Sequence, residues 1–481
     1  MARGFSFFYL FFYWQVTLHY ACKFSPGKLD YSQLTTYSLY IYLMYLSLGG
    51  DQNKPVMPDI TLDQSQFQPD SKLIEWMRDI RRTIHQYPEL GNEEHSTQKF
   101  ICDKLQELDI PFRTEGLNTG IVATIEPSVS DDSDVLPCIA LRADLDALPV
   151  DEKTGLSFAS KFPGVMHACG HDGHVAMLLG AASMLRHTEL PGKVILLFQP
   201  AEESGEGALA MIEDGAFAGV QAIFAGHIDR HFNVGQIAAE PGLICAYTDK
   251  FEIKVCGRGG HAARPHETTD AIVVASLLVM SIQTLVSREI NPSYPTVVSV
   301  GRFNGGSAYN VIAEGAVLEG TIRATHPEIR AQIIDGLKRM VRAMDGLYNA
   351  KTTLHFRKGL PPVINHPLAA RLARKAAKKV VGQESVVKQR HPSLGGEDFS
   401  YFLQKVPGCL VRFGAAYPDL PNTPAHSPYF DFDEGVLPIG AAFLAEVALQ
   451  ALQQKEVFTS HEGNPSDTII WPDLHNKENK K

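Results

Sequence analysis

The sequence predicts an α/β protein in which a three-layer domain is interrupted by a smaller inserted domain. Short apolar runs alternate with helical segments from residue 71 to residue 227, a pattern typical of a buried sheet with helices on both faces. Between residues 251 and 357 the order becomes strand–helix–strand–strand–helix–strand, the βαββαβ order of a ferredoxin-like unit. Helical periodicity returns at residues 369–381 and 435–453, so we expect the chain to re-enter the first domain.

Two amphipathic helices begin the large domain. Residues 71–87 place Met77, Ile80 and Ile84 at helical spacing, and residues 97–108 form a second apolar stripe. The remaining elements are expected as strands at 120–125, 138–142, 194–199 and 222–227 and helices at 174–186 and 208–214.

The inserted domain is expected to contain strands at 251–255, 297–303, 317–323 and 352–357 and helices at 270–286 and 327–347. The predicted boundaries are therefore residues 70–247 and 359–456 for the two parts of the large domain and 248–358 for the insert. No internal repeat is evident.

The two ends of the chain do not share this pattern. Residues 1–57 form an atypical aromatic-rich segment, whose apolar runs are shorter than the roughly 20 residues that a membrane-spanning helix needs. The first run follows Arg3, so a signal sequence ending near Cys22, an anchor and a misassigned start all stay open. Residues 459–481 are polar and are expected to form a disordered tail.

Composition excludes several functional classes. The chain of 481 residues is 44% apolar and 20% charged, as expected of a globular protein. A net charge of −10, without a block of Lys or Arg, argues against nucleic acid as the main partner. The seven scattered cysteines are typical of a reducing compartment. We expect a cytoplasmic protein without a stable membrane span.

Residues 166–174 read Met-His-Ala-Cys-Gly-His-Asp-Gly-His, and a thiol with several imidazoles is a ligand set for a transition metal. The apolar run 194–199 leads into the adjacent acids Glu202 and Glu203. Neighbouring carboxylates repel each other unless a cation or a proton separates their roles. One carboxylate on a metal and the other holding water would resolve this repulsion.

Other polar residues follow predicted strands, where ligands of α/β domains usually bind. Asp144 and Asp146 follow the run 138–142, and His227 follows the run that starts at residue 222. Cys169 and His171 can share a site only in irregular backbone, which Gly170 permits. His426 lies in a proline-rich loop before the last helix, a rigid setting that suits a ligand.

Each group has a simpler interpretation when it is taken alone: a structural histidine, a solvated turn, or ion pairs with Arg142. Cys169 could be a small buried hydrophobic residue, or a nucleophile assisted by His171. The nucleophile hypothesis leaves the carboxylates and the other histidines unexplained. Together, the residues favour a metal site with a general base.

Several motifs, in their order along the chain, resemble those of the amidohydrolase branch of the co-catalytic metallopeptidases. That group includes hippurate hydrolase, N-acyl-amino-acid amidohydrolases and the plant hydrolases of indole-acetyl amino-acid conjugates. The match runs from about Ile80 to Ala451. It comprises the motifs at residues 81–90, 142–149, 167–174, 198–203, 257–262, 310–312, 320–323, 396–399 and 426–428.

The resemblance implies a three-layer α/β metallopeptidase catalytic domain with an inserted ferredoxin-like lid. The implied reaction cleaves the amide bond of N-acyl amino acids, hippurate-like or N-acetyl, with metal-activated water. Two divalent metal ions are implied, Zn²⁺ or Mn²⁺, with Co²⁺ or Ni²⁺ also open. The implied ligands are Cys169, His171, Glu203, His227 and His426.

Further roles come from the same resemblance. Glu202 matches the position of the family's general base, and Asp146 matches the position of the acid that orients a metal ligand. His261 matches a lid histidine that stabilises the oxyanion, in relatives often from a partner subunit, so a homodimer through the lid is implied. Asn310 and Arg323 are candidates for binding the substrate carboxylate, with structural bonds within the lid sheet as the alternative.

The chain also departs from the family pattern. The usual Trp-Pro segment after His227 is replaced by Ile-Asp-Arg-His-Phe at residues 228–232, and Ala313 replaces a proline. The first change flanks the site and leaves substrate preference open. The alternatives are a dipeptidase or carboxypeptidase on the same scaffold and a non-catalytic binding relative; intact Glu202 and all five ligand positions argue against the last.

Overall fold

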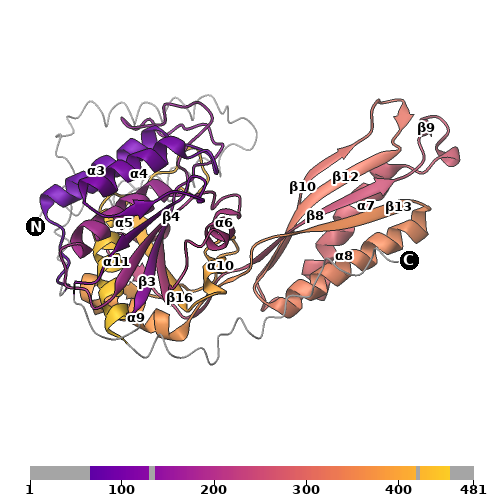
Figure 1. Cartoon of the computed structure of the whole chain (residues 1–481). Helices are drawn as coiled ribbons and strands as arrows, with labels where there is room; N and C mark the ends of the chain where they lie inside the picture. The colour runs from indigo at the N-terminus through magenta and orange to yellow at the C-terminus, as the bar shows by residue number, and fades with distance from the viewer. Residues whose placement is uncertain (1–64, 129–135, 419–422, 455–481) are drawn as a thin grey trace, which may run out of the picture. The chain divides into compact units, whose positions relative to one another are not determined.

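The computed structural model describes residues 65–128, 136–418 and 423–454 (Figure 1). The aromatic-rich segment 1–57 and the tail 459–481 lie outside these residues, so their predicted nature stays a prediction. The chain forms a large α/β domain and a smaller domain inserted between β7 (Gly242–Cys245) and β14 (Val363–Asn365). The predicted fold class is confirmed.

The large domain is built on an eight-stranded mixed sheet. Its central strands run parallel: β4 (Lys193–Gln199), β3 (Cys138–Asp144), β5 (Ala222–Asn233) and β16 (Gly408–Ala416). The short strands at the edges are β1 (Phe112–Arg113), β2 (Ile121–Ile125), β6 (Ile237–Ala238) and β15 (Val386–Val387). The strand order is β1-β2-β4-β3-β5-β16-β6-β15, with β2 and β6 antiparallel to their central neighbours.

The central strands contribute to two hydrophobic cores, one on each face of the sheet. In β4, Leu196 and Phe198 belong to the larger core, whereas Ile195 and Leu197 belong to the smaller one. Successive side chains of a strand point to opposite faces, so this alternation means that both faces are covered. A strand buried on both faces reads as a continuous apolar run, which is why the sequence pattern predicted it.

Helices supply the outer layers. The larger core is covered by α3 (Ser71–Gln86), α4 (His95–Glu107), α5 (His171–Leu185), α9 (Pro367–Val381) and α11 (Val436–Gln453), and the smaller core by α6 (Gly207–Glu213) and α10 (Ser400–Leu403). A Cβ added at Gly180 of α5 would lie 2.2 Å from the Met77 sulfur of α3. The close approach of these helices therefore requires a glycine.

The inserted domain has the predicted βαββαβ order. Its elements are β8 (Tyr247–Cys256), α7 (Ala271–Thr284), β10 (Thr296–Gly305), β12 (Gly315–Ala324), α8 (Pro327–Tyr348) and β13 (Lys351–Lys358). The strands form an antiparallel sheet in the order β10-β12-β8-β13, and α7 and α8 pack against it (Figure 1). Phe251, Leu278 and Leu337 belong to a core made only of residues of the insert.

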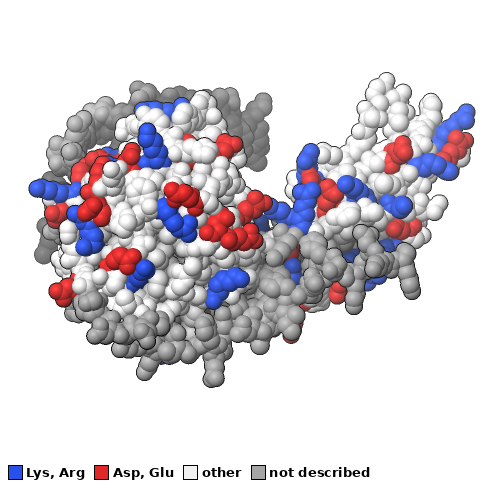
Figure 2. All heavy atoms as spheres, in the orientation of Figure 1, with Lys and Arg blue, Asp and Glu red and all other residues white. Residues whose placement is uncertain are grey.

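The two connections of the insert pair with each other. β7 and β14 form an antiparallel pair with Cys245 opposite Val363. This pairing was not predicted, and the predicted domain boundaries stay predictions. Among the described residues, α11 and the segment Ala271–Glu289 are long and apolar enough to cross a membrane, but α11 is 89% buried in the large domain. Figure 2 shows acidic and basic side chains interspersed on the visible face, without a region of one sign.

Candidate metal centre

Polar residues from distant parts of the sequence meet at the carboxyl edge of the parallel strands. β4 ends just before Glu202 and Glu203, β5 carries His227, α5 begins at His171, and the loop before α11 carries His426. Loops at this edge of an α/β sheet leave room for a ligand. The predicted ligand positions therefore meet at the usual binding edge of the fold.

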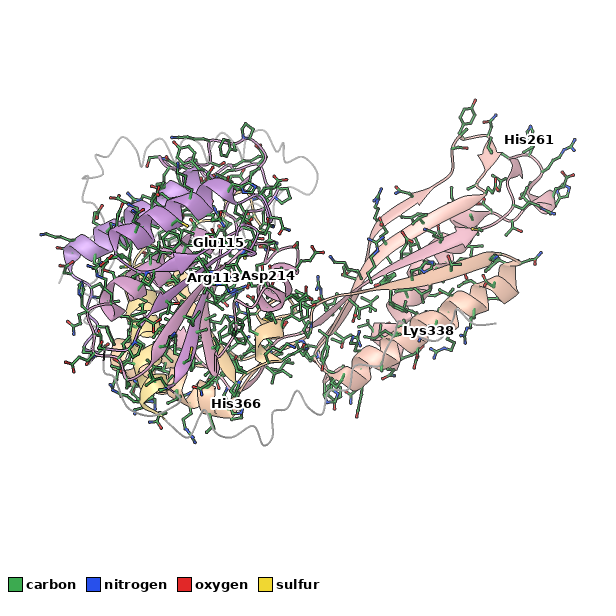
Figure 3. The ribbon with its side chains drawn as sticks, viewed as in Figure 1. Arg113, Glu115, Asp214, His261, Lys338 and His366 are labelled. Atoms are coloured by element: carbon green, nitrogen blue, oxygen red, sulfur yellow. The ribbon has the colours of Figure 1, made fainter. Side chains whose placement is uncertain are left out.

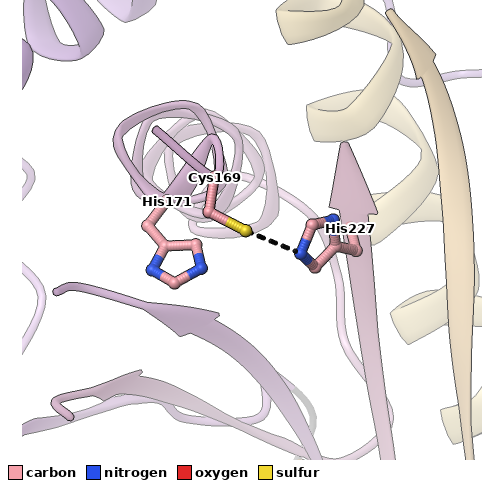
Figure 4. A group of neighbouring side chains, drawn as sticks. All are labelled: Cys169, His171 and His227. Carbon is pink, nitrogen blue, oxygen red and sulfur yellow. Dashed lines mark hydrogen bonds between the residues drawn. The ribbon is translucent and has the colours of Figure 1, made fainter. Parts of the chain in front are cut away.

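Cys169 and His171 flank Gly170 at the start of α5. Gly170 has a φ of 96°, in the left-handed region that glycine adopts without strain. With this backbone, both flanking side chains point toward the same space (Figure 4). There the Sγ atom of Cys169 lies 3.5 Å from Nε2 of His227. The irregular backbone expected at Gly170 is observed.

His171 and His227 present the same ring nitrogen to this space. Nδ1 of His171 lies 2.8 Å from the carbonyl oxygen of Asp146, and Nδ1 of His227 lies 2.7 Å from that of Ile228. Because a carbonyl oxygen only accepts, each Nδ1 carries a proton, and each Nε2 is the ring nitrogen that faces the cluster. A histidine fixed in this way through its second nitrogen is oriented as a metal ligand.

Glu203 and His426 extend the cluster from two different loops. The Nε2 atom of His426 lies 3.2 Å from Oε1 of Glu203. His426 has a φ of 66°, which is uncommon for a residue other than glycine. Its N–H donates to the carbonyl oxygen of Ala168 at 2.8 Å, which ties this loop to the residue before Cys169. The structure thus brings all five predicted ligands together.

The donor set fits divalent metal ions. Ligand atoms of Cys169, His171 and His227 lie within 4.8 Å of one another, as do those of Cys169, Glu203 and His426. Thiol, imidazole and carboxylate donors are the ligands that Zn²⁺ and similar ions take. Nε2 of His171 is buried without a hydrogen-bond partner in the described part of the chain, which is costly unless something binds there.

Asp146 holds two of the predicted ligands. Its carbonyl oxygen accepts from His171, and its Oδ2 accepts from the backbone N–H of Glu203 at 2.9 Å. Asp146 is 2% exposed, so these bonds are shielded from water. Orientation of metal ligands by such a neighbour is a common feature of metal sites.

Glu202 is buried beside the ligand cluster among other acids. Its Oε1 accepts a hydrogen bond from the backbone N–H of Asp398 at 3.4 Å. Burial first, and then the charges of Glu397 and Asp398, raise the pKa of Glu202 well above its ordinary value. Arg142 partly balances this charge, because its Nη2 lies 3.1 Å from Glu397 Oε1 and 3.0 Å from Asp398 Oδ1. A carboxyl group with a pKa raised in this way beside possible ligands is a candidate for proton transfer.

Glu397 and Asp398 had no role in the sequence-based assignment. The signal that could have found them is the adjacent acid pair after Gly395 and Gly396, which resembles the Glu202-Glu203 pair. Asp398 also accepts from Gln199 Nε2 and from the N–H of Ala208, each at 2.9 Å. It therefore fixes the loop that carries Glu202.

The other polar residues of segment 167–174 mainly contact residues outside the predicted ligand set. His174 is bonded through both ring nitrogens, to Asp144 at 2.5 Å and to the N–H of Ile228 at 2.9 Å. Asp172 accepts from Arg81 at 2.9 Å and from His85 at 2.8 Å. Both ring nitrogens of His174 are therefore engaged, whereas both bonds to Asp172 go to Oδ2 and leave its Oδ1 buried without a partner among the described residues. His167 is buried without a hydrogen-bond partner among the described residues, and burial lowers its pKa to about 4.

The three lid residues fall into two groups. Arg323 on β12 lies opposite Thr248, near the start of β8, and lines the same pocket as the ligand cluster. His261 and Asn310 are exposed and lie beyond the other end of β8, about 30 Å along the strand from its start. Figure 3 shows His261 at the tip of the insert. The structure does not bring His261 or Asn310 to the cluster of the same chain.

A pocket of about 950 Å³ is lined by four of the five predicted ligands, all except His171. These lining residues are Cys169, Glu203, His227 and His426, and the proposed base Glu202 lines the pocket beside them. Basic side chains also line it, namely Arg230, Lys250, Arg323, Arg357 and Arg412. A pocket with ligand-type residues and several cations suits a small anionic substrate.

Comparison with known proteins gives the class to which this fold and site belong. Residues 140–450 match Peptidase family M20/M25/M40. The chain belongs to this family and is a metal-dependent hydrolase. The predicted resemblance to its amidohydrolase branch is confirmed by the relatives.

Two relatives and one solved structure illustrate the match. The chain is 41% identical to N-acetyl-L-cysteine deacetylase of Bacillus subtilis, over 78% of this chain and 88% of the relative. It is 38% identical to IAA-amino acid hydrolase ILR1-like 2 of Arabidopsis thaliana, over 87% of this chain and 95% of the relative. The crystal structure of Bacillus subtilis YXEP protein, a dinuclear metal-binding peptidase of the M20 family, matches with a TM-score of 0.69 and 34% identity, over 80% and 99% of the two chains.

Proposed function

We propose that the protein hydrolyses the amide bond of N-acyl amino acids to release a carboxylic acid and a free amino acid. The observation that carries this proposal is the buried Glu202, with its raised pKa, beside a cluster of metal-ligand residues in one pocket with Arg323. Amide hydrolysis needs a general base, and an amino-acid carboxylate needs a cation. The relatives named N-acetyl-L-cysteine deacetylase and IAA-amino acid hydrolase support the same substrate class.

The ligand cluster is proposed to hold two divalent metal ions. The residues are Cys169, His171, Glu203, His227 and His426. The solved relative is a dinuclear metal-binding peptidase, which supports the number two. Zn²⁺ or Mn²⁺ is expected, and Co²⁺ or Ni²⁺ stays open because this ligand set does not separate them. When bound, such ions polarise a carbonyl oxygen and lower the pKa of water.

Glu202 is proposed to move the proton. The N–H of Asp398 holds one of its oxygens, so the carboxyl group stays beside the cluster. Its carboxylate takes a proton from the attacking water and delivers it to the nitrogen of the leaving amine. Burial and neighbouring acids raise the pKa of Glu202, which favours holding the proton until it passes to the leaving amine. Asp146 keeps His171 and Glu203 in place during the reaction.

The carboxylate of the amino-acid half is proposed to bind Arg323. The side chain is partly buried and lines the pocket, and burial lowers its pKa without removing its charge. A guanidinium offers two parallel donors that match a carboxylate.

The substitution Glu202→Gln tests the role of the base. The amide keeps the size of the side chain but cannot take a proton, so kcat should fall by about 10²–10⁴-fold while metal content is unchanged. The control is Glu213→Gln, an exposed position on α6 that should retain wild-type kcat. Near-normal turnover by the Glu202 variant would exclude this role.

Cys169 is proposed to be a ligand and not a nucleophile. Burial raises the pKa of its thiol to about 12, so the nucleophilic thiolate does not form at neutral pH without a bound cation. Cys169→Ser should lower the metal content measured by elemental analysis, whereas Cys256→Ser, at an exposed thiol of the insert, should not. Full metal content together with lost activity would favour the nucleophile hypothesis.

The insert is proposed to form a homodimer. Helix α7 exposes Ile272, Val273, Leu277 and Met280, and β10 is an edge strand of the sheet. Nδ1 of His261 accepts from the N–H of Ala263 at 3.0 Å, so its Nε2 carries a proton that can be donated to an oxyanion. In this proposal, His261 of the partner subunit serves the site, together with Asn310 of the partner subunit.

Sedimentation velocity tests the dimer. The wild-type protein should sediment as a dimer at micromolar concentration, and Met280→Glu should shift it toward monomer because a charge would enter the apolar contact. A wild-type monomer with full activity would contradict both the dimer and the role of His261.

A substrate panel separates the proposed reaction from its alternatives. It contains N-acetyl amino acids, N-benzoyl amino acids and dipeptides. Preferred turnover of dipeptides would favour a dipeptidase or carboxypeptidase. Ligand binding without turnover of any compound by the metal-loaded protein would favour a non-catalytic relative. The cytoplasmic location stays a prediction.

A further inference from the structure

Arg412 is a buried cation next to a predicted metal ligand. It lies on β16 directly opposite His227 of β5, so the two side chains lie on the same face of the sheet. The residue is 7% exposed, yet it lines the pocket that contains the ligand cluster. It has no role in the mechanism proposed above.

Three other buried arginines, Arg81, Arg142 and Arg330, each contact a carboxylate, unlike Arg412. Nε of Arg81 lies 2.9 Å from a carboxylate oxygen of Asp172, and Nε of Arg330 lies 2.7 Å from one of Asp249. Arg142 contacts three acids. Arg412 has no ion pair with any described residue.

The one side-chain hydrogen bond of Arg412 within the described ranges goes to a thiol. Its Nη2 lies 3.0 Å from Sγ of Cys245, while Nε is buried without a partner. Burial raises the pKa of Cys245 to about 11, so the thiol is neutral at pH 7 and only a weak acceptor. The contact with Cys245 therefore leaves Arg412 without a carboxylate in direct contact among the described residues.

The acids near Arg412 are engaged elsewhere. Asp229, which also lines the pocket, is bonded to Nδ1 of His231 at 2.7 Å. Glu397 accepts from Arg142 at 3.1 Å. A buried guanidinium without a counter-ion is costly, and its remaining donors suit a planar anion such as a carboxylate.

We propose that Arg412 forms a second anion subsite, which binds a carboxylate of the substrate other than the one bound by Arg323. This inference rests on the proposed hydrolysis of N-acyl amino acids and deepens it: the preferred substrates carry two carboxylates. The second carboxylate belongs either to an acidic amino-acid side chain or to a dicarboxylic acyl group. Both present the same chemistry to Arg412.

Matched substrate pairs separate these two sources. N-acetyl-aspartate is compared with N-acetyl-asparagine, and N-succinyl-alanine with N-butanoyl-alanine. In one of the pairs, the wild-type kcat/KM should be at least about 10-fold higher for the dicarboxylate. The pair that shows the preference identifies the half of the substrate that Arg412 contacts.

The substitution Arg412→Met tests the residue itself. The ratio of kcat/KM values within the preferred pair should fall by about 10- to 100-fold, because a charge-assisted hydrogen-bonded pair is lost. Arg374→Met is the control, since this arginine of α9 binds Glu240 at 2.7 Å and does not line the pocket. The ratio of kcat/KM values within the preferred pair should be the same in Arg374→Met as in the wild type. Arg412→Gln repeats the test if the methionine variant does not fold.

Direct binding gives a readout that does not depend on turnover. Titration calorimetry with glutarate should show binding to the metal-loaded wild-type protein that weakens by about 10-fold or more in Arg412→Met. Equal ratios and equal glutarate affinities in the wild type and the variant would overturn the subsite. Absence of turnover for every N-acyl amino acid, with Arg412-dependent glutarate binding, would overturn the proposed reaction but retain the anion subsite.

Discussion

Replacing Gly170 by alanine tests whether the backbone at the start of α5 sets metal affinity. Gly170 has a φ of 96°, which costs a residue with a Cβ about 1–2 kcal/mol. The added Cβ would lie 3.2 Å from Cβ and 3.3 Å from Cδ1 of Ile228, so one of the two segments must shift. Ile228 holds His227 through its carbonyl oxygen, and Cys169 and His171 are the direct neighbours of Gly170. One added methyl group therefore disturbs three predicted ligands.

The magnitude follows from these contacts. Strain and crowding together should lower the free energy of unfolding of the metal-free protein by about 1–3 kcal/mol. Displaced ligands should weaken metal binding by about 10- to 100-fold, the range for changes to groups that position ligands. Urea unfolding measures the first quantity, and competition with a chromogenic chelator measures the second.

Gly116→Ala is the matched control. Gly116 has a φ of 75°, but a Cβ added there meets nothing within 4 Å. Backbone strain should lower the free energy of unfolding of this variant by a similar amount, while its metal affinity should equal that of the wild type. If Gly170→Ala is destabilised but binds metal as tightly as the control, then the backbone at Gly170 does not position the ligands and the reasoning is refuted.

Two further predictions concern stability. Arg330→Met should destabilise the insert by about 3–5 kcal/mol in urea unfolding, because the buried Asp249 would lose two hydrogen bonds of 2.7 Å; a loss below 1 kcal/mol would contradict this. His366, labelled in Figure 3, caps α9 by accepting from the N–H of Leu368 at 3.3 Å, and burial lowers the pKa of His366. The folded state thus prefers the neutral ring. The contribution of this cap to the free energy of unfolding is therefore complete above the unfolded pKa of about 6.5, and it is lost as the pH falls toward the pKa of the folded state. Between pH 7 and pH 5 the wild type should lose about 0.5–1 kcal/mol more than His366→Asn, and equal losses would rule out the titrating cap.

Much of the fold could be predicted because burial leaves a local pattern. The run at 194–199 reads as apolar throughout because β4 is covered on both faces. The βαββαβ order could be predicted because the insert forms a core from its own residues, so each of its elements carries its own apolar pattern. The pairing of β7 with β14 was not readable, because its partners are short and more than 100 residues apart.

The candidate site was partly predictable for the same reason. Gly170 between Cys169 and His171, and the adjacent pair Glu202-Glu203 after a strand, are local signals of unusual backbone and unusual charge. Arg412 gave no such signal, since it lies in an otherwise apolar strand and its thiol partner is 167 residues away.

The sequence by itself determined the α/β class, the inserted unit, the family resemblance and the candidate ligand set. Only the tertiary structure decided which ring nitrogens of His171 and His227 face the cluster and which acids raise the pKa of Glu202. It also showed that Arg412 forms no ion pair within the described part of the chain. The reason is physical. Apolar periodicity and backbone geometry are properties of short segments, whereas hydrogen-bond partners and electrostatic environments arise from contacts between segments that are distant in the chain.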